Sequence, residues 1–322
     1  MKPVIKPVTT LSPYMNIKRI EFVVTYHCSG KCIHCSVGDR LNQSDGYHHV
    51  RTPEAVKAIE WLADHYAVSS VMTFGGEPLL YPDVVCAIHS TAAACGIEAR
   101  QLITNGYFSK EEQRIGEVAQ ALKDAGVNNL MLSVDAFHQQ TIPVASVYSF
   151  ARYAKLAGIP KLRLQPAWLV NQAHDNPYNQ KTREVLSAFQ DLDIPVSSGN
   201  DIFLAGNAAK YLSEYYAAPK LNLSDSCGSL PYTEPLNNIT SLSIVPNGDV
   251  MICSFVIGNI YRESMEEIVA RYNPYENECM RAILTGGASG LVDLARKRGV
   301  SVDCEECYSV CDLCRRICGA DN

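Results

Sequence analysis

Short apolar runs alternate with longer stretches of helical periodicity from about residue 19 to residue 198. This alternation is typical of consecutive βα units that share one parallel sheet. The short runs predict six strands, at Ile20–Thr25, Ser70–Phe74, Ala99–Thr104, Leu130–Val134, Leu162–Gln165 and Ile194–Ser197. Helical spacing of apolar residues predicts five helices between them, at Pro53–Tyr66, Asp83–Cys95, Lys110–Ala125, Ala145–Ala157 and Thr182–Leu192. Six units are too few to close an eight-stranded barrel, so we expect an α/β fold, an open, partial (βα)6 TIM barrel.

The pattern changes after about residue 200, where prolines interrupt regular periodicity. Ser241–Val245 and Val250–Phe255 flank a Pro-Asn-Gly-Asp turn, which predicts a β-hairpin. Helices are expected around Ser264–Tyr272 and Gly290–Arg298. The sequence therefore predicts an N-terminal segment (1–17), the barrel (18–200), a linker (201–235) and a small C-terminal domain (236–322).

Composition and charge narrow the class of protein. The 322 residues are 47% hydrophobic and 19% charged, which is typical of a compact globular chain. The formal net charge of −6 argues against broad contact with nucleic acid or an anionic membrane. No apolar run is long enough to span a bilayer, and residues 1–13 lack the apolar core of a signal peptide. We therefore expect a cytoplasmic protein without nucleic-acid or membrane partners.

Thirteen cysteines make metal chemistry the leading interpretation. Their odd number excludes a closed disulfide framework of a secreted domain. Three of them lie between residues 28 and 35, and eight lie from residue 227 onward, so two separate metal regions are predicted. Cys86 and Cys95 share a predicted barrel helix and are interpreted as small buried hydrophobes.

Cys28-Ser-Gly-Lys-Cys32-Ile-His-Cys35 directly follows the first predicted strand. Three thiolates from one loop leave one iron of a cubane [4Fe–4S] cluster without a protein ligand. The position at the C-terminal end of a barrel strand favours catalysis over a structural metal site. The alternative is a zinc site of three cysteines completed by His34, His27 or the His48-His49 pair.

The spacing of this loop resembles that of the radical S-adenosylmethionine (SAM) superfamily, whose enzymes carry it on the first βα loop of a partial barrel. Gly75-Gly76-Glu77-Pro78, after the second strand, resembles the segment whose backbone and carboxylate receive the amino group of SAM. The physics agrees, because glycines allow close backbone approach and a buried carboxylate can hold an ammonium group. Each short motif also has a bland interpretation, as a turn or a helix cap.

Further ligand contacts follow from the same resemblance. Thr104-Asn105-Gly106 after the third strand and Ser133-Val134-Asp135 after the fourth resemble the family's ribose and carboxylate contacts. His34 occupies the place at which related enzymes hold an aromatic residue against adenine, and Gln165 ends the fifth strand as an additional ligand contact.

The C-terminal cysteines resemble the SPASM and Twitch extensions, which hold auxiliary iron–sulfur clusters. The resemblance implies one auxiliary [4Fe–4S] cluster, with a preferred ligand set of Cys227, Cys253, Cys311 and Cys314. A second cluster held by Cys304, Cys307, Cys318 and Cys279, and a zinc site held by Cys304, Cys307, Cys311 and Cys314, stay open as alternatives. If unligated, Cys279 is a candidate hydrogen-atom donor to a substrate radical.

Together these motifs imply reductive cleavage of SAM to a 5′-deoxyadenosyl radical that abstracts a hydrogen atom from a substrate C–H bond. Enzymes with such extensions commonly cross-link, epimerise or oxidise peptides, so maturation of a ribosomally made peptide is the expected function. The expected partners are the substrate, a flavodoxin- or ferredoxin-type electron donor and a separate leader-peptide recognition protein. The alternatives are an epimerase or dehydrogenase of an amino sugar or other small metabolite, and a non-catalytic iron–sulfur or zinc-binding protein.

Overall fold

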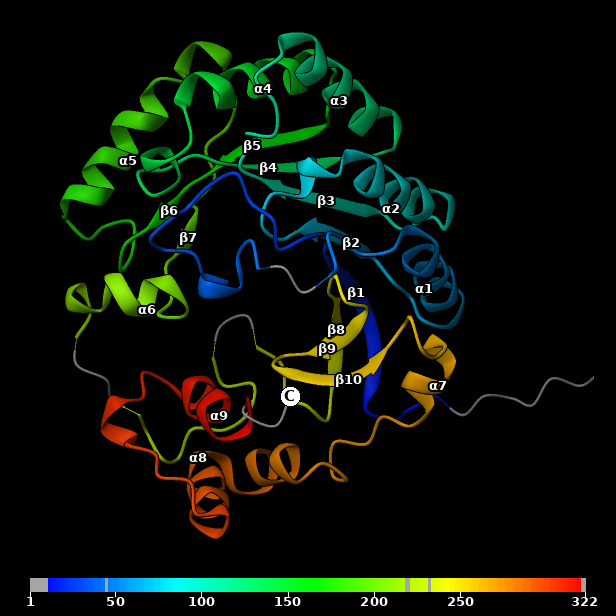
Figure 1. Cartoon of the computed structure of the whole chain (residues 1–322), viewed down its shortest axis with the longest axis vertical. Coiled ribbons are helices and arrows are strands. Elements are labelled where there is room, and N and C mark those ends of the chain that lie inside the picture. The colour runs from blue at the N-terminus through cyan, green and yellow to red at the C-terminus, as the bar shows by residue number, and fades with distance from the viewer. Residues whose placement is uncertain (1–10, 44–45, 218–220, 231–232, 320–322) are drawn as a thin grey trace, which may run out of the picture.

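One mixed sheet organises the chain in the computed structural model, which describes residues 11–43, 46–217, 221–230 and 233–319. Within these residues, eight strands follow the order β10-β9-β8-β1-β2-β3-β4-β5 (Figure 1). The sheet curves without closing, and its helices lie outside it. This open arrangement confirms the expected α/β partial barrel. Residues 1–10 of the predicted N-terminal segment lie outside the described residues.

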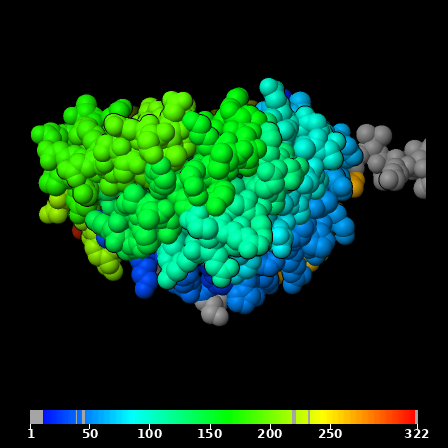
Figure 2. All heavy atoms as spheres, turned by 90° about the horizontal axis from the view of Figure 1, so that it is seen from above, coloured from blue at the N-terminus to red at the C-terminus, as the bar shows by residue number. Residues whose placement is uncertain are grey.

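The barrel half of the sheet is parallel, and each strand is followed by a helix. Its strands are β1 (Met15–Val23), β2 (Ser70–Phe74), β3 (Ala99–Thr104), β4 (Asn129–Ser133) and β5 (Lys161–Gln165). The helices are α1 (Thr52–His65), α2 (Pro82–Ala94), α3 (Glu112–Asp124), α4 (Val144–Leu156) and α5 (Pro177–Ser187). Figure 2 shows one face of the molecule formed mostly by residues of this barrel half, in blue-cyan to green.

The sixth predicted strand, Ile194–Ser197, is reduced to one bridge between Leu164 and Val196. Pro195 lies in the middle of this stretch and has no N–H to donate to a ladder. Its carbonyl accepts from the Leu164 N–H at 2.9 Å, and the Ser197 N–H donates to the Leu164 carbonyl at 2.9 Å. The prediction of a regular sixth strand is therefore wrong, although the segment lies where that strand would be.

The predicted hairpin is confirmed, and it continues the barrel sheet. β8 (Ile239–Ile244) pairs parallel with β1, and β9 (Asp249–Ile252) and β10 (Phe255–Asn259) follow as antiparallel strands. The predicted run Val250–Phe255 is in fact broken at Cys253, whose φ of 55° turns the chain into β10. More than two hundred residues separate β8 from β1, so the local pattern of apolar residues does not predict that they pair.

Helices complete the C-terminal part of the chain. α7 (Met265–Ala270) begins with a capping box between Ser264 and Glu267, and α9 (Val310–Cys318) packs on α8 (Glu278–Arg298). Within α8, Gly287 has φ +57° and ψ −148°, and the Ala288 N–H donates to the Asp225 carbonyl at 2.9 Å. This hydrogen bond at the kink holds the loop that leads to Cys227 against the helix.

A small second hydrophobic core joins residues of the barrel region to the segment that follows it. It consists of Phe137, Leu169, Ile202, Ala208 and Leu212. Two short strands, β6 (Ala167–Trp168) and β7 (Asn200–Asp201), and the helix α6 (Asn207–Tyr211) surround it. This core fixes the end of the barrel region relative to the loop after β4.

Candidate functional site

The cysteine-bearing loop follows β1 and is held by side chains from distant segments. The Cys28 N–H donates to Oδ1 of Asn42 at 2.9 Å. The Lys31 N–H donates to Oγ1 of Thr141 at 3.1 Å. Hydrogen bonds from outside the loop thus fix its backbone at two points.

The thiols of Cys28, Cys32 and Cys35 lie close enough to influence one another electrostatically. Burial raises the pKa of Cys28 to about 12, and the charges of Glu77 and Cys35 add to this effect. Burial also raises the pKa of Cys32, followed by the influence of Asp135 and the other two thiols. Coordination removes the thiol proton outright, so a bound metal group would hold these clustered thiols as thiolates. The donor set fits an iron–sulfur cluster, whose irons are bound by cysteine thiolates.

Gly75 and Gly76 pack directly against the chain that leaves β1. The Gly76 N–H donates to the Thr25 carbonyl and the Glu77 N–H donates to the His27 carbonyl, both at 2.8 Å. A Cβ on Gly76 would lie 2.1 Å from the His27 carbonyl oxygen, and one on Gly75, whose φ is +143°, would lie 2.5 Å from the Thr25 oxygen. Glycine is required at both positions because backbone meets backbone there.

The Glu77 carboxylate is fully buried and accepts three hydrogen bonds from the chain. The donors are Thr104 Oγ1 at 2.6 Å, the Asn105 N–H at 2.8 Å and the Leu79 N–H at 2.9 Å. Glu77 therefore ties the loop after β3 to the glycine pair. The resemblance assigns this carboxylate to the amino group of SAM, and that contact stays a prediction. Pro78 starts a short 3-10 turn, Pro78–Leu80, and is buried.

Stability should fall between pH 5 and pH 8 because of Glu77. Burial outweighs the three donors and raises the pKa of this carboxyl from 4.5 to about 7. The folded state thus keeps a proton that the unfolded state has lost, so the free energy of unfolding decreases as pH rises through this window. Urea titrations should show a shallower decrease for Glu77→Gln than for the exposed control Glu60→Gln. Equal slopes in the two variants would contradict this assignment.

Asp135 is a fully buried carboxylate that organises the loop after β4. Its Oδ1 accepts from the N–H groups of Phe137 and His138 at 2.9 Å, and its Oδ2 accepts from the Ala167 N–H at 3.1 Å. Nδ1 of His138 lies 2.8 Å from the same Oδ2. Although burial alone would raise it, the charge of His138 and the hydrogen bonds from its imidazole and its backbone N–H lower the pKa of Asp135 to about 2. The carboxylate is therefore committed to the protein's own groups.

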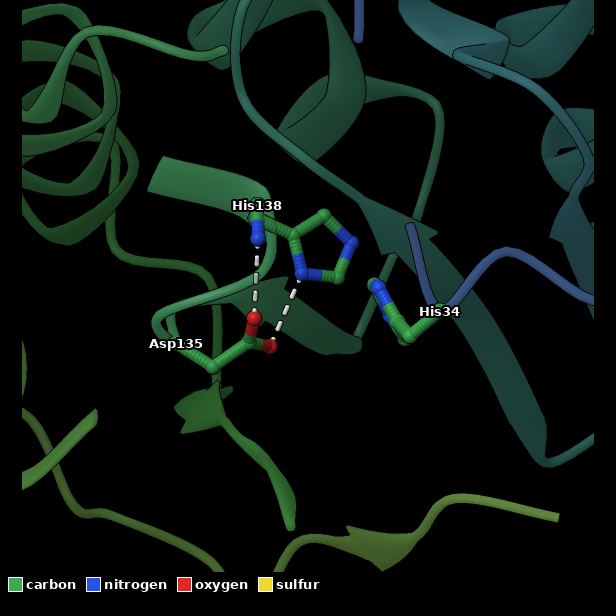
Figure 3. A group of neighbouring side chains, drawn as sticks. All are labelled: His34, Asp135 and His138. Carbon is green, nitrogen blue, oxygen red and sulfur yellow. Dashed lines mark hydrogen bonds and ion pairs between the residues drawn. The ribbon is translucent and has the colours of Figure 1, made fainter. Parts of the chain in front are cut away.

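His34, Asp135 and His138 form a compact group, with ligand atoms within 4.8 Å of one another (Figure 3). The His34 and His138 rings meet edge to face, with centroids 4.7 Å apart, and the centroid of Phe137 lies 5.0 Å from that of His34. Burial lowers the pKa of His34 to about 4, so this imidazole is neutral at pH 7. Its Nδ1 is buried without a hydrogen-bond partner among the described residues. The expected stacking of His34 on adenine stays a prediction, and sequence reasoning missed His138 altogether.

A cavity of about 280 Å³ joins the predicted site residues at the C-terminal ends of the barrel strands. Asn200, Asp201, Ile202 and Phe203 complete part of its wall. Glu77 and Pro78 support this wall from behind and are not among the lining residues. The predicted residues that line the cavity are Cys28, Cys32, His34, Cys35, Gly75, Gly76, Thr104, Asn105, Ser133, Asp135 and Gln165.

The preferred auxiliary set also converges, from three separate segments. Cys227 lies in a loop, Cys253 lies at the turn between β9 and β10, and Cys311 and Cys314 lie on α9. The thiols of Cys253, Cys314 and Cys227 all contribute to raising the pKa of Cys311 to about 11, after the larger effect of burial. The four thiols are therefore neighbours, as a four-thiolate cluster site requires. Their role as ligands stays a prediction.

The other C-terminal cysteines separate into two groups. Cys318 interacts with Cys314 and Cys279, whereas Cys307 is influenced by Cys304. Within the described residues, these interactions do not join the two groups into a second four-cysteine site. Cys279 is buried in α8, 3.5 Å from Nη1 of Arg298, and is not among the residues that line the cavity. Its position therefore offers no support for the predicted role as hydrogen-atom donor.

Several residues that shape the site carry no motif in the sequence. Asn42, Thr141 and Asn207 contact the cysteine loop, yet lie at least seven residues from its last cysteine. His138 had one available signal, its spacing of three residues from Asp135 in a loop that follows a predicted strand. Single asparagines and threonines in loops are too common for such an inference.

Family models match both metal regions. One described as the radical SAM superfamily matches residues 22–207, and SPASM, described as an iron–sulfur cluster-binding domain, matches residues 237–314. Both matches fall on the segments whose motifs carry the resemblance, which is thereby confirmed. None of the helices in the described part of the chain has the length and apolarity needed to cross a membrane.

Curated relatives match part of the chain. A GTP 3′,8-cyclase of Moorella thermoacetica is 26% identical over 155 residues, which are 46% of this chain and 46% of the relative. A GTP 3′,8-cyclase of Lactiplantibacillus plantarum is 32% identical over 118 residues, 37% of this chain and 33% of the relative. The chain thus spans less than half the length of these relatives. The solved structure of native anSMEcpe with bound AdoMet has a TM-score of 0.51 at 13% identity, covering 83% of this chain and 82% of that one, which shows the fold alone.

Proposed function

Because the chain belongs to the radical SAM superfamily, whose family model covers residues 22–207, we propose that it cleaves S-adenosylmethionine reductively and abstracts a hydrogen atom from a substrate C–H bond. The observation that carries this proposal is the convergence of three thiols on the cavity that Gly75, Gly76 and Asn105 also line. A radical SAM protein binds a [4Fe–4S] cluster and SAM, and a SPASM domain binds auxiliary iron–sulfur clusters. Both cofactor sites have a counterpart in the cysteine groups described above.

Cys28, Cys32 and Cys35 would hold the cluster, and the adjoining cavity would hold SAM. When bound, this pair supplies one-electron cleavage of the sulfonium and a 5′-deoxyadenosyl radical, chemistry that no side chain can provide. The side chains and backbone of the protein fix the shape of the cavity around this pair. Hydrogen bonds through Glu77 fix the loop after β3, and close backbone packing fixes the glycine pair beside it.

The Asp135 and His138 pair offers a proton-transfer group in the same cavity. Asp135 orients the His138 imidazole through Nδ1 at 2.8 Å, so the rest of the ring is available to the cavity that His138 lines. Burial alone would lower the pKa of His138, but the neighbouring Asp135 carboxylate raises it, so the imidazole holds a proton more strongly than a free histidine does. His138 is thus suited to exchange a proton with an O–H or N–H group of the substrate, in a step separate from the hydrogen-atom abstraction.

We propose that the substrate is a ribosomally made peptide, which the enzyme matures by cross-linking, epimerisation or oxidation. The support is the SPASM match over residues 237–314, together with the convergence of Cys227, Cys253, Cys311 and Cys314. An electron donor of the flavodoxin or ferredoxin type would reduce the first cluster. A separate protein would present the peptide through its leader.

A small amine-bearing metabolite, such as an amino sugar, is the second candidate. The observation that favours it is the charge of the cavity wall. Among the described lining residues there is no lysine or arginine, whereas the Asp201 carboxylate is exposed. Such a wall suits a neutral or cationic substrate better than an anionic one.

GTP should not be a substrate, in contrast to the name of the curated relatives. A triphosphate is normally bound by arginine and lysine side chains, which the described wall lacks. Adding GTP to reduced enzyme and SAM is expected to leave the rate of 5′-deoxyadenosine formation unchanged and to yield no cyclised nucleotide by mass spectrometry. A GTP-dependent product would contradict this interpretation of the cavity.

The deciding experiment for the proposed function is incubation of the anaerobically reconstituted protein with SAM and dithionite. Formation of 5′-deoxyadenosine and methionine is the expected result. Full iron loading without 5′-deoxyadenosine would favour a non-catalytic iron–sulfur protein. Zinc in place of iron at Cys28, Cys32 and Cys35 would favour the zinc-binding alternative.

A further inference from the structure

A segment beyond the barrel strands contacts the backbone of the cysteine loop directly. The Asn207 N–H, at the start of α6, donates to the Cys35 carbonyl at 2.9 Å. Nδ2 of the same asparagine donates to the Cys32 carbonyl at 3.1 Å. One residue thus binds the carbonyl groups of two of the three cysteines, from 175 residues beyond Cys32 in the chain.

Gly206 allows this contact. Its φ is +55°, and a Cβ there would lie 2.5 Å from the Ser36 carbonyl oxygen and 2.7 Å from that of Cys35. Gly38, three residues after Cys35, also lies against it, since a Cβ on Gly38 would lie 3.1 Å from the Gly206 Cα. The two segments therefore lie backbone against backbone, with no room for a side chain between them.

The contact is anchored in the second hydrophobic core, against which Ile33 of the cysteine loop also packs. Ala208 and Leu212, which follow Asn207, are fully buried in the second hydrophobic core with Phe137 and Ile202. The position of Asn207 is therefore set by packing that does not involve the cysteines. Within the loop, the hydrogen bond from the Cys35 N–H to the Cys32 carbonyl is 3.2 Å long, so the external donors add to a weak internal constraint.

We propose that Asn207 is a positioning residue for the first iron–sulfur cluster, because it fixes the turn that sets the relative placement of the Cys32 and Cys35 thiols. A cluster requires its three sulfurs at fixed separations, and a cysteine side chain reaches only two bonds from the backbone. Holding both carbonyls therefore limits where both sulfurs lie. This inference rests on the proposed function in one respect, that the loop binds a [4Fe–4S] cluster.

The test compares Asn207→Ala, Asn207→Gln and the control Asn171→Ala in the otherwise unchanged, reconstituted chain. Asn171 is an exposed loop asparagine whose Oδ1 accepts from the Ala173 and His174 N–H groups, so its loss removes comparable local contacts away from the cysteines. The measurements are the rate of iron loss to a chelator and the electron paramagnetic resonance signal of the reduced protein with and without SAM. The SAM-induced change in this signal reports the first cluster, because only that cluster has an iron without a protein ligand.

Asn207→Ala is expected to lose iron from the first site about fivefold to tenfold faster, the effect of one lost hydrogen bond, and to show a weakened SAM-induced change. Asn207→Gln keeps an amide donor and should recover most of both properties, and Asn171→Ala should match the unchanged chain. Asn207→Asp also keeps the backbone donor and lacks the side-chain donor. It should therefore show the same faster loss of iron, and it tests the proposal if Asn207→Ala folds poorly.

Three outcomes would each overturn a claim. If the unchanged chain binds iron and responds to SAM, but Asn207→Ala and Asn207→Asp do the same at the same rates, the positioning role is wrong and the proposed function stands. If the unchanged chain shows no SAM-dependent signal at full iron loading, the proposed function fails, and the inference with it. A loss of signal in Asn171→Ala equal to that in Asn207→Ala would show a general fold effect and would also overturn the positioning role.

Discussion

Cys32→Ala is expected to abolish the formation of 5′-deoxyadenosine from SAM, with a loss of at least about a thousandfold, because no other group in the chain supplies this chemistry. Cys32 is the most buried of the three loop cysteines, at 7% exposure, and its carbonyl is held by Asn207. Two remaining thiolates cannot hold a cubane cluster firmly. The measurements are anaerobic product analysis by liquid chromatography and iron per chain, which should fall by about four.

The matched control is Cys95→Ala. Cys95 is a half-buried cysteine that ends α2 and is not among the residues that line the cavity, so its loss should leave iron content and product formation unchanged. The folded state of both variants can be compared by circular dichroism. Undiminished 5′-deoxyadenosine formation by Cys32→Ala would exclude the loop as the site of SAM cleavage.

Gly76→Ala is expected to reduce SAM cleavage by about a hundredfold and to destabilise the protein by about 3 kcal/mol. The added Cβ would lie 2.1 Å from the His27 carbonyl oxygen and 2.7 Å from its carbon, so the backbone of one segment must shift. The shift would displace the glycine pair from the loop that carries Cys28, and with it the wall of the cavity. The rate of 5′-deoxyadenosine formation and a urea titration measure the two effects.

Gly286→Ala is the control for the general effect of adding a methyl group to a glycine. No heavy atom lies within 4 Å of a Cβ built on Gly286, which is in α8 and has no positive φ. Alanine should therefore be tolerated there or stabilise the helix slightly. If Gly76→Ala behaves like Gly286→Ala in both measurements, close backbone approach is not what position 76 requires.

The C-terminal region shows how a correct motif can lead to an incomplete picture of the fold. The Pro-Asn-Gly-Asp turn correctly predicted antiparallel strands, because turn chemistry is local. The parallel pairing of β8 with β1 depends on a contact across more than two hundred residues. The hydrophobic pattern of β8 does not encode which strand it pairs with, because that depends on the edge of the barrel sheet that β1 offers.

The charged residues of the site show a similar contrast. The motifs after the second and fourth strands predict that Glu77 and Asp135 belong to the site. Both are fully buried; Asp135 lines the cavity and Glu77 lies behind its wall. Their hydrogen bonds to Thr104, Asn105 and His138 show that the chain itself engages both carboxylates. Burial makes an unpaired carboxylate costly, so the fold supplies donors that no spacing rule identifies.

The sequence by itself determined the class of fold, five of its barrel strands, the cysteine loop after the first strand and the motifs after the second, third and fourth. These depend on hydrophobic period, on glycine and on residue type at short spacing, which are local properties of the chain. Only the tertiary structure decided that β8 extends the barrel sheet, that Cys279 lies away from the cavity, and that His138 and Asn207 belong to the site. Their roles arise from packing between segments far apart in the chain, where the three-dimensional distance has no fixed relation to the separation in sequence.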